Sequence, residues 1–422
     1  MAVKEYKLKY GSSKVAVSLE EQQVADVIHI ADYPPLENPR EVLRRSFYNP
    51  IGCKPLDQII QPGQTVSIIV NDSTRVANTS LIVEVLLEEL NKLGVPDENI
   101  CFVFALGSHR VMTDEEMIHE LGEEAFRRIR CYNSDCTKDD EFKYFGTTSF
   151  GTPVWFNKHV VDADHIICTG SILHHFFSGF GGGRKAMLPG VSRKDTITAN
   201  HSHMPEPGAK LGKLAGNPVY EDQIEGVKMC PPSFLINVVL DASKRFLKVF
   251  SGHYITAHTE ACEFVNQVYG AEIAKEADIV IASCGGYPKD INIYQMQKTM
   301  DNAWCAVRQG GVVIMLAECI EGSGSPTLEK AMREGKNADT IEKKLRDNFV
   351  LGGHKAFAIA RLGRKAEFIL VSALDPDFAR MMLFTPAANI EEALELAHAK
   401  VGKDASVILM PDGSYTVPRL KE

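Results

Sequence analysis

Polar and ionisable residues follow three strand-like runs of the sequence, one after another. NDSTR at 71–75 follows TVSIIV, SHR at 108–110 follows ICFVFALG, and SILHH at 171–175 follows ADHIICTG. In open parallel sheets, ligands bind in the crevice outside the carboxyl ends of the strands. The three loops therefore predict one small-molecule site, and the histidines in two of them can act as acid and base near neutral pH.

A glycine-rich loop, SGFGGGRKAMLPG at 178–190, comes directly after the two histidines. So many glycines expose backbone N–H groups, which can cradle a phosphate. The loop is not a Walker A motif, because Arg184 precedes Lys185 and Ala186 follows it. A glycine-rich stretch alone is more often a tight turn. The adjacent Arg-Lys and His-His pairs favour a phosphate-binding interpretation here.

Nine of the thirteen histidines are assigned to two groups. Four are interpreted as surface or hydrogen-bonded core residues, namely His253, His258, His354 and His398. Five lie in predicted strand-end loops beside Ser, Thr, Arg or Lys, namely His109, His174, His175, His201 and His203. A histidine-only zinc site can also be built from the second group.

The second half of the chain adds polar residues after another strand-like run, ADIVIASC. GGYPKD at 285–290 follows it, and Gln295 and Lys298 then share one face of a predicted helix at i, i+3 spacing. A solvated helix face is the ordinary interpretation of such a pair. Their place after a strand makes them candidates to reach across an interdomain cleft.

The elements that must position these residues alternate between strand and helix patterns. Strand-like runs at 65–70 and 100–107 flank a helical pattern at 80–94, which predicts βαβ units. Thr113 and Glu116 form a capping box that predicts a helix over DEEMIHELGEEAFRRI. Strand runs resume at 277–286, 310–318, 367–373 and 405–411. The sequence predicts two α/β domains, 1–270 and 271–422, with mainly parallel sheets and an active-site cleft between them.

Bulk composition narrows the class of partner. The 422 residues carry a formal net charge of −9 with dispersed Lys and Arg, which argues against nucleic acid and anionic membranes. No run of about 20 apolar residues and no signal-peptide pattern occurs, so a cytoplasmic protein is expected. The ten cysteines lack a CxxC pair and are interpreted as reduced thiols, although the Cys131 and Cys136 spacing weakly resembles a metal pair.

Five motifs in this order resemble the lactate racemase (LarA) family of nickel-pincer nucleotide enzymes over nearly the whole chain. They are NDSTR at 71–75, GSHR at 107–110, HFFSGFGGGRKAMLPG at 175–190, ANHS at 199–202 and GGYPKDINIYQMQK at 285–298. The resemblance implies a pyridinium mononucleotide carrying a thioamide and a thiocarboxylate, tethered to Lys185, with nickel held by a ring carbon, two sulfurs and His201. Soft donors and one imidazole in a tetragonal plane suit Ni(II).

The same resemblance assigns roles to the matched residues. His109 and His175 would be the two catalytic bases. Residues expected to bind the cofactor are Asp72, Ser73, Thr74, Arg75, Ser178, Gly179, Gly182, Gly183, Lys185, Pro189 and His201. Residues expected to bind the substrate are Arg75, Tyr294, Gln295 and Lys298. Gly181 stands where the family commonly has a serine, and the family pattern fixes no role for His174.

The implied reaction inverts C2 of a small 2-hydroxy acid. A hydride moves to the pyridinium ring while a histidine takes the hydroxyl proton, and return of the hydride to the other face of the 2-keto acid inverts the centre. Lactate leads, and malate, a larger hydroxy acid or an aldonate remain open, with 318–360 expected to vary as the pocket wall. Cofactor-biosynthesis proteins are the expected partners. The alternatives are a zinc hydrolase using His109, His175 and His201, and a non-catalytic nucleotide-binding protein.

Overall fold

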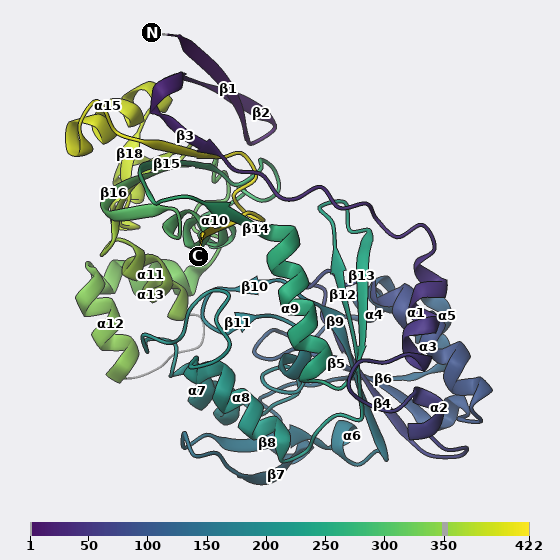
Figure 1. The fold of residues 1–422 in the computed structure, drawn as a ribbon. Coiled ribbons are helices and arrows are strands. Elements are labelled where there is room, and N and C mark those ends of the chain that lie inside the picture. Colours follow the sequence, from purple (N-terminus) through teal and green to yellow (C-terminus); the bar gives the residue numbers. More distant parts are fainter. Residues whose placement is uncertain (1, 348–352, 422) are drawn as a thin grey trace. The chain divides into compact units, whose positions relative to one another are not determined.

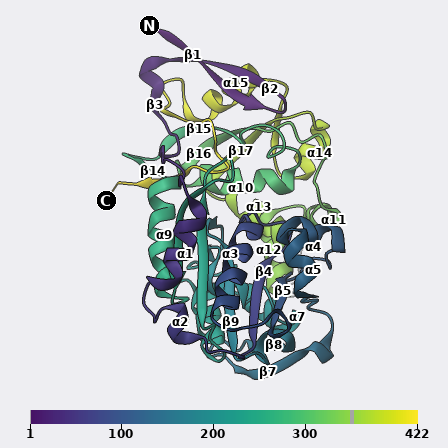
Figure 2. The same ribbon diagram turned by 90° about the vertical axis from the view of Figure 1, so that its right-hand side faces the viewer.

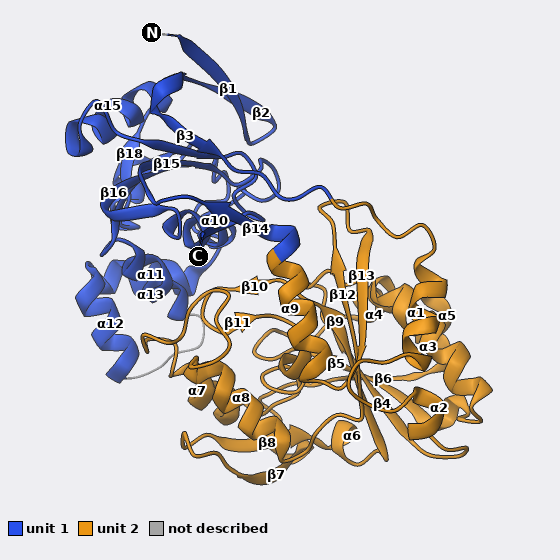
Figure 3. Cartoon of the chain, in the orientation of Figure 1, with its two compact units in different colours: residues 1–32, 267–422 blue, residues 33–266 orange. Residues whose placement is uncertain are grey.

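The computed structural model describes residues 2–347 and 353–421. The chain divides into two compact units, one of residues 33–266 and one that combines 1–32 with 267–422 (Figure 3). Both contain a mainly parallel sheet with helices, so the predicted α/β class is confirmed. Each unit is described by itself below.

The unit of residues 33–266 is built on a six-stranded sheet with the order β13-β12-β9-β4-β5-β6 (Figure 1). Five strands are parallel, and β13 runs antiparallel to β12. The strands are β4 (Val66–Asn71), β5 (Ile100–Ala105), β6 (Arg130–Asn133), β9 (His165–Ser171), β12 (Phe234–Leu240) and β13 (Phe246–Gly252). The carboxyl ends of β4, β5 and β9 therefore lie at one edge, as the sequence predicts.

Both faces of this sheet are covered, because alternate strand residues enter different cores. Ile68 and Val70 belong to the core beneath one helical layer, whereas Ile69 belongs to the opposite core. The first layer contains α1 (Pro39–Tyr48), α3 (Thr79–Lys92), α4 (Asp114–Leu121) and α5 (Glu123–Arg128), and the turned view shows α1 beside α3 (Figure 2). Helices on the other face include α6 (Lys158–Val161), α8 (Pro218–Lys228) and α9 (Thr256–Tyr269).

The predicted capping box is present, but the helix that it opens is interrupted. Thr113 accepts a bond from the backbone N–H of Glu116, whose carboxylate bonds back to the Thr113 N–H. The single helix expected over this stretch is instead α4 followed by α5, separated at Gly122 with φ 85°. A glycine adopts this angle at little cost, which permits the break.

Short helices and hairpins outside the main sheet complete this unit. They are α2 (Leu56–Ile59), the hairpin β7 (Phe142–Thr147) with β8 (Pro153–Asn157), the short hairpin β10 (His174–His175) with β11 (Gly179–Phe180), the 3-10 turn η4 (Gly183–Ala186) and α7 (Lys194–His201). Of these, the hairpin of β10 and β11, the turn η4 and helix α7 lie between β9 and β12 in the sequence.

The other unit contains a six-stranded, wholly parallel sheet with the order β18-β17-β16-β15-β19-β3. Its strands are β3 (Val24–Val27), β15 (Ala277–Ser283), β16 (Val307–Leu316), β17 (Ala366–Val371), β18 (Thr385–Ala387) and β19 (Val407–Met410). The hairpin β1 (Val3–Tyr10) with β2 (Ser13–Glu20) and helix α15 (Ile390–Val401) share one core with this sheet. The pair β14 (Gly270–Ile273) and β20 (Val417–Leu420) completes its strands among the described residues.

Its remaining helices are α10 (Ile293–Trp304), α11 (Pro326–Gly335), α12 (Ala338–Asp347), α13 (His354–Leu362) and α14 (Pro376–Met381). The expected pocket wall at 318–360 includes residues 348–352, which lie outside the described residues. No helix in the described part of the chain is long and apolar enough to cross a membrane.

The division of the chain differs from the contiguous domains 1–270 and 271–422 in one respect. Residues 1–32 join the C-terminal unit, because β3 pairs with β19 and the apolar side of the first hairpin enters that unit's core. The second boundary lies between 266 and 267, inside α9. The pairing of the short strand β3 with the distant strand β19 leaves no signal in the local composition, so it could not be predicted from the sequence.

Candidate active site

The loops after β4 and β5 meet in a carboxylate–imidazole pair. Nδ1 of His109 is in short contact with Oδ2 of Asp72, and Asp72 is 3% exposed. The other carboxylate oxygen, Oδ1, accepts bonds from the backbone N–H and the hydroxyl of Thr74 at 3.2 and 2.7 Å. Asp72 therefore fixes the imidazole while Thr74 fixes Asp72.

This pairing sets the tautomer of His109. Burial raises the pKa of Asp72, but the bond from His109, its charge and the bond from Thr74 outweigh burial and leave the pKa below its usual value. Because an ionised carboxylate only accepts, Nδ1 of His109 must carry the proton and donate it. Nε2 of the neutral ring then has a lone pair and can accept a proton.

The glycine loop is folded tightly against the carboxyl end of the sheet. Gly182 and Gly183 have φ of 68° and 55°, and a Cβ on either would lie within 2.6 Å of Ile172 or His258 respectively. The N–H of Gly183 donates to Oδ1 of Asn237, a buried residue of β12, at 2.8 Å. Only glycine fits these two positions, and Asn237 holds the loop to the sheet.

Lys185 lies in η4 and is partly buried. Burial lowers the pKa of its amine well below 10.5, and the nearby positive charges of Arg184 and Arg75 lower it further. A lowered pKa raises the fraction of the amine that is neutral, and therefore nucleophilic, at a given pH. This is the state that a covalent tether through nitrogen requires.

The ring of Phe177 brings three predicted residues together. Its centroid lies 5.6 Å from Nζ of Lys185, 4.6 Å from the ring centroid of His175 and 5.0 Å from that of His201. His201 is the last residue of α7 and is 9% exposed. The glycine loop, the preceding histidine pair and α7 therefore converge at one place, as the predicted site requires.

The loop bearing His109 is tied to the glycine loop by the backbone. The N–H of Gly107 donates to the carbonyl of Gly190 at 2.9 Å, and the N–H of Gly190 donates to the carbonyl of Lys185 at 3.0 Å. Two residues after Gly107, His109 is half-exposed. These bonds relate the Asp72–His109 pair to the segment that carries Lys185.

His175 has a different hydrogen-bond environment from His109. The backbone N–H of Ser178 donates to its Nδ1 at 3.3 Å. A neutral ring that accepts at Nδ1 carries its proton on Nε2. The Nδ1 atoms of the two neutral rings therefore have opposite roles, because that of His109 donates a hydrogen bond and that of His175 accepts one.

The remaining predicted residues of this unit are placed as follows. Ser73, Thr74 and Arg75 are exposed in the turn after β4, and the Arg75 guanidinium contacts the Thr74 oxygens at 3.5 Å. The hydroxyl of Ser178 is fully buried and donates to Gln223 at 3.0 Å. Gly179 pairs with His175 in the short hairpin, and Pro189 follows η4.

The predicted substrate-binding residues belong to the other unit. Tyr294, Gln295 and Lys298 lie in α10, where Nζ of Lys298 donates to Oε1 of Gln295 at 3.0 Å. Nζ of Lys355 lies 4.6 Å from the ring centroid of Tyr294. The helix begins at Asn292, whose side chain accepts from the N–H of Gln295. The predicted i, i+3 pair of Gln295 and Lys298 is thus present.

Comparison with known proteins assigns the chain to a family. The lactate racemase N-terminal domain model matches residues 10–212, and the lactate racemase C-terminal domain model matches 273–417. The chain belongs to the lactate racemase family. It is accordingly an enzyme of the isomerase class, a racemase.

Individual relatives of the lactate racemase family match over almost the full length. The lactate racemase of Thermoanaerobacterium thermosaccharolyticum is 33% identical, with 98% of this chain and 99% of that protein covered. The lactate racemase of Lactiplantibacillus plantarum is 32% identical, with 96% and 97% covered.

Solved structures agree with the sequence comparison. The lactate racemase apoprotein from T. thermosaccharolyticum superposes with a TM-score of 0.90 at 33% identity, covering 99% of this chain and 100% of that one. A protein from Thermotoga maritima superposes with a TM-score of 0.68 at 17% identity, over 93% of this chain and 100% of that one, which shows a shared fold.

Other residues considered from the sequence have structural partners. Nε2 of His174 bonds Oδ1 of Asn266 at 2.9 Å, and its ring packs on Phe180. His203 packs edge-on against Phe150. Burial raises the pKa of both Cys131 and Cys136. Within residues 2–347 and 353–421, no three His, Cys, Asp or Glu residues are grouped so that they could hold a metal ion.

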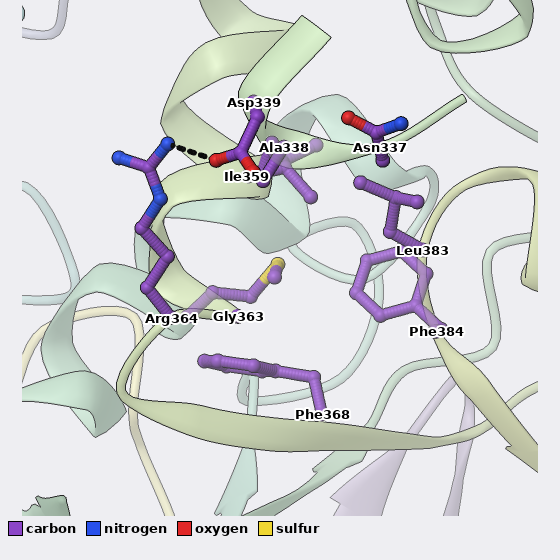
Figure 4. A pocket seen from close by; sticks show the side chains of 11 residues that line it. Asn337, Ala338, Asp339, Ile359, Gly363, Arg364, Phe368, Leu383 and Phe384 are labelled. Carbon is purple, nitrogen blue, oxygen red and sulfur yellow. Dashed lines mark hydrogen bonds and ion pairs between the residues drawn. The ribbon is translucent and has the colours of Figure 1, made fainter. Parts of the chain in front are cut away.

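A cavity of about 370 Å³ lies in the C-terminal unit (Figure 4). The ion pair between Asp339 and Arg364, at 2.8 Å, closes one side of it. Its apolar lining includes Met300, Ile359, Phe368, Leu383 and Phe384. None of the predicted catalytic, cofactor-binding or substrate-binding residues lines this cavity, although Asn337, Asp339 and Ile359 belong to the expected pocket wall at 318–360.

Sequence reasoning missed the residues that organise the site from within. Phe177, Asn237 and Gln223 carry no chemistry that a motif search would select, and His258 was interpreted as a core residue. His258 is 1% exposed and its Nε2 lies 3.1 Å from Nη1 of Arg184, which agrees with that interpretation. The only sequence signal for Phe177 as a site residue was its position between His175 and the glycines.

Proposed function

We propose that this racemase inverts C2 of a small 2-hydroxy acid, with lactate the leading substrate, through a nickel-pincer nucleotide tethered to Lys185 and a nickel ion bound by His201. The observation that carries the proposal is the convergence of Lys185, His175 and His201 around Phe177. Both relatives described above are lactate racemases, which supports lactate as the substrate.

The residues present fit such a cofactor. Lys185 offers an amine whose pKa is lowered by burial, which suits acylation at nitrogen. His201 offers an imidazole close by, and one imidazole beside sulfur and carbon donors suits a tetragonal Ni(II) site. When bound, the pyridinium ring of this group would supply the acceptor for the hydride of the substrate. The exposed backbone around 71–75 would hold the nucleotide's ribose and phosphate.

His109 would remove the hydroxyl proton of one enantiomer through Nε2. The bond between Nδ1 and Asp72 orients the ring and stabilises the imidazolium that forms, since Asp72 keeps its negative charge. His175, in its protonated imidazolium form, would return a proton on the other side of the keto acid. Two bases are required because C2 of the planar 2-keto acid must present its other face to the hydride donor, which moves the carbonyl oxygen to the other side of the site, where a second histidine protonates it.

Arg75 would bind the substrate carboxylate, because a guanidinium can form two parallel bonds to it. We propose that Lys298 and Gln295 contribute a charge and a hydrogen bond to the same substrate. Deprotonation of the hydroxyl favours departure of the C2 hydrogen as hydride, because the electron pair of the oxygen then forms the carbonyl bond, whereas Arg75 holds the substrate carboxylate in place. The histidines and Arg75 therefore have complementary tasks.

Deuterium at C2 of lactate tests the proposal. If the hydrogen moves as hydride and returns, 2-deuterated L-lactate incubated with the cofactor-loaded protein in ordinary water should give D-lactate that keeps its deuterium. Racemisation by simple proton removal would exchange the deuterium with solvent. Loss of deuterium in the product would reject the hydride route, and absence of D-lactate would reject lactate as substrate.

The zinc-hydrolase alternative receives no support from the described residues, because His109, His175 and His201 do not form a metal-binding group there. A non-catalytic nucleotide-binding role does not account for the Asp72–His109 pair, which is arranged for proton transfer rather than for holding a phosphate.

A further inference from the structure

Five polar side chains with no exposed surface form a connected chain inside the unit of residues 33–266. They come from the glycine loop, α7 and α8, and each has 0% of its surface exposed: Ser178, Arg184, Asn200, Asp222 and Gln223. Buried polar groups in such number are costly unless each finds a partner. Their bonds therefore show what the structure holds in place.

The bonds run in one direction from a cation to an anion. Nε of Arg184 donates to Oε1 of Gln223 at 3.1 Å, and Nε2 of Gln223 donates to Oδ1 of Asn200 at 3.1 Å. Nδ2 of Asn200 then donates to Oδ2 of Asp222 at 2.7 Å. Two amides, each accepting at oxygen and donating at nitrogen, thus connect a guanidinium to a carboxylate. We call this chain the amide relay.

Both ends of the amide relay are anchored by further bonds. Arg184 donates to the carbonyl of Ser178 at 2.7 Å, and the hydroxyls of Thr148 and Thr152 donate to Asp222 at 2.6 and 2.8 Å. The amide orientations are fixed because Oε1 of Gln223 faces two donors, the hydroxyl of Ser178 being the second. Among the described residues, Gln223 is the side chain through which the relay connects Arg184 to Asn200.

Gln223 bonds to two residues, and each of them is the chain neighbour of a residue proposed to bind the cofactor. Arg184 immediately precedes Lys185 in η4, and Asn200 immediately precedes His201 at the end of α7. We propose that Gln223 is a positioning residue that fixes η4, which carries Lys185, and the end of α7, which carries His201, relative to each other. This inference rests on the proposed function for the meaning of Lys185 and His201, but the coupling itself needs no cofactor.

Two substitutions separate the links. Gln223→Met removes the acceptor and the donor with little change in volume, so both segments should loosen. Gln223→Glu keeps an acceptor for Arg184 but has no proton to donate to Asn200, because a carboxylate beside a guanidinium stays ionised. It should loosen the end of α7 and leave the glycine loop ordered. If the Met variant does not fold, the Glu variant alone tests the asymmetry.

Hydrogen exchange of the cofactor-free chain measures the coupling. In Gln223→Met, amides of 178–190 and 194–204 should exchange about tenfold faster or more, because a buried donor and a buried acceptor lose their partners. The matched control is Glu89→Gln, since Glu89 is also a buried polar residue of this unit with three partners, Arg44, Tyr48 and Lys92, and lies on α3. Faster exchange confined to α8, or equal to the control, would overturn the proposal.

Nickel content gives a second readout in protein coexpressed with the cofactor-making enzymes. The ratio of nickel to covalent adduct should fall in both Gln223 variants. Loss of a partner that orients a metal ligand typically lowers metal affinity by about ten- to hundredfold. Adduct on Lys185 should persist, at least in Gln223→Glu. A ratio equal to that of Glu89→Gln would refute the positioning role, whereas adduct retained in Lys185→Ala would refute the proposed function instead.

Discussion

Replacement of Asp72 by asparagine is expected to turn the His109 imidazole into its unreactive tautomer. Thr74 donates to Oδ1 of residue 72 from both its backbone N–H and its hydroxyl. An asparagine must place its oxygen on that side, so its NH₂ group would face Nδ1 of His109. Since the NH₂ can only donate, Nδ1 would become an acceptor and Nε2 would carry the proton.

The size of the effect follows from what is lost. Nε2 no longer accepts the hydroxyl proton, and the negative charge that stabilises the imidazolium is removed. The pKa of Asp72 is below its usual value, so the native residue is ionised throughout the neutral range. An exchange that installs the wrong tautomer in a carboxylate–histidine pair costs about 10⁴-fold in rate. That corresponds to about 5 kcal/mol of barrier.

The assay is racemisation of each lactate enantiomer by protein with matched cofactor content, followed by chiral chromatography. Adduct mass and nickel content should be unchanged in Asp72→Asn if residue 72 acts on His109. Glu89→Gln is the matched control, because it makes the same chemical change at another buried carboxylate of this unit. A rate for Asp72→Asn within threefold of the control would refute the tautomer argument. Loss of adduct would instead assign Asp72 to the cofactor.

Three further predictions concern the other candidate residues. Acetic anhydride should label Lys185 of the cofactor-free chain half-maximally at a pH well below 10.5, because burial and the charges of Arg184 and Arg75 disfavour the ammonium form and lower its pKa; labelling at the pH of exposed lysines would contradict this. His201→Ala should keep the adduct but lose most nickel, as measured by metal analysis, and full nickel occupancy would point to another ligand. His109→Ala and His175→Ala should each lower racemisation by about 10² to 10⁴-fold equally in both directions, yet in single turnovers form keto acid from opposite enantiomers; a shared preference would exclude the two-base assignment.

Much of the fold follows from short-range sequence patterns. The strands at 66–71, 100–105, 165–171 and 277–283 are continuous apolar runs, and helix α3 has the expected period, so their types are readable. Pairings between distant segments are not readable in this way. The parallel partnership of β3 with β19 moves residues 1–32 into the C-terminal unit, and the antiparallel strand β13 has no local mark that distinguishes it from a parallel one.

The candidate site shows the same division. His109, His175 and Lys185 follow strands or glycines and have polar neighbours, which made them predictable, whereas His201 was expected in a strand-end loop and is instead the last residue of helix α7. Asp72 was expected at the nucleotide, whereas its side chain is bonded to His109, because contact across two loops cannot be read from either loop alone. Gln223 and Asn237 were not predicted, since a buried amide in a helix or strand looks like any other polar residue until its partners are known.

The most direct test of the account is the location of the cofactor on the chain. Protein coexpressed with the cofactor-making enzymes should racemise lactate and show one added mass by intact mass spectrometry, which peptide mapping assigns to Lys185. Lys185→Ala should be folded, unmodified and inactive. An active preparation without added mass, or an adduct that persists in Lys185→Ala, would contradict the account.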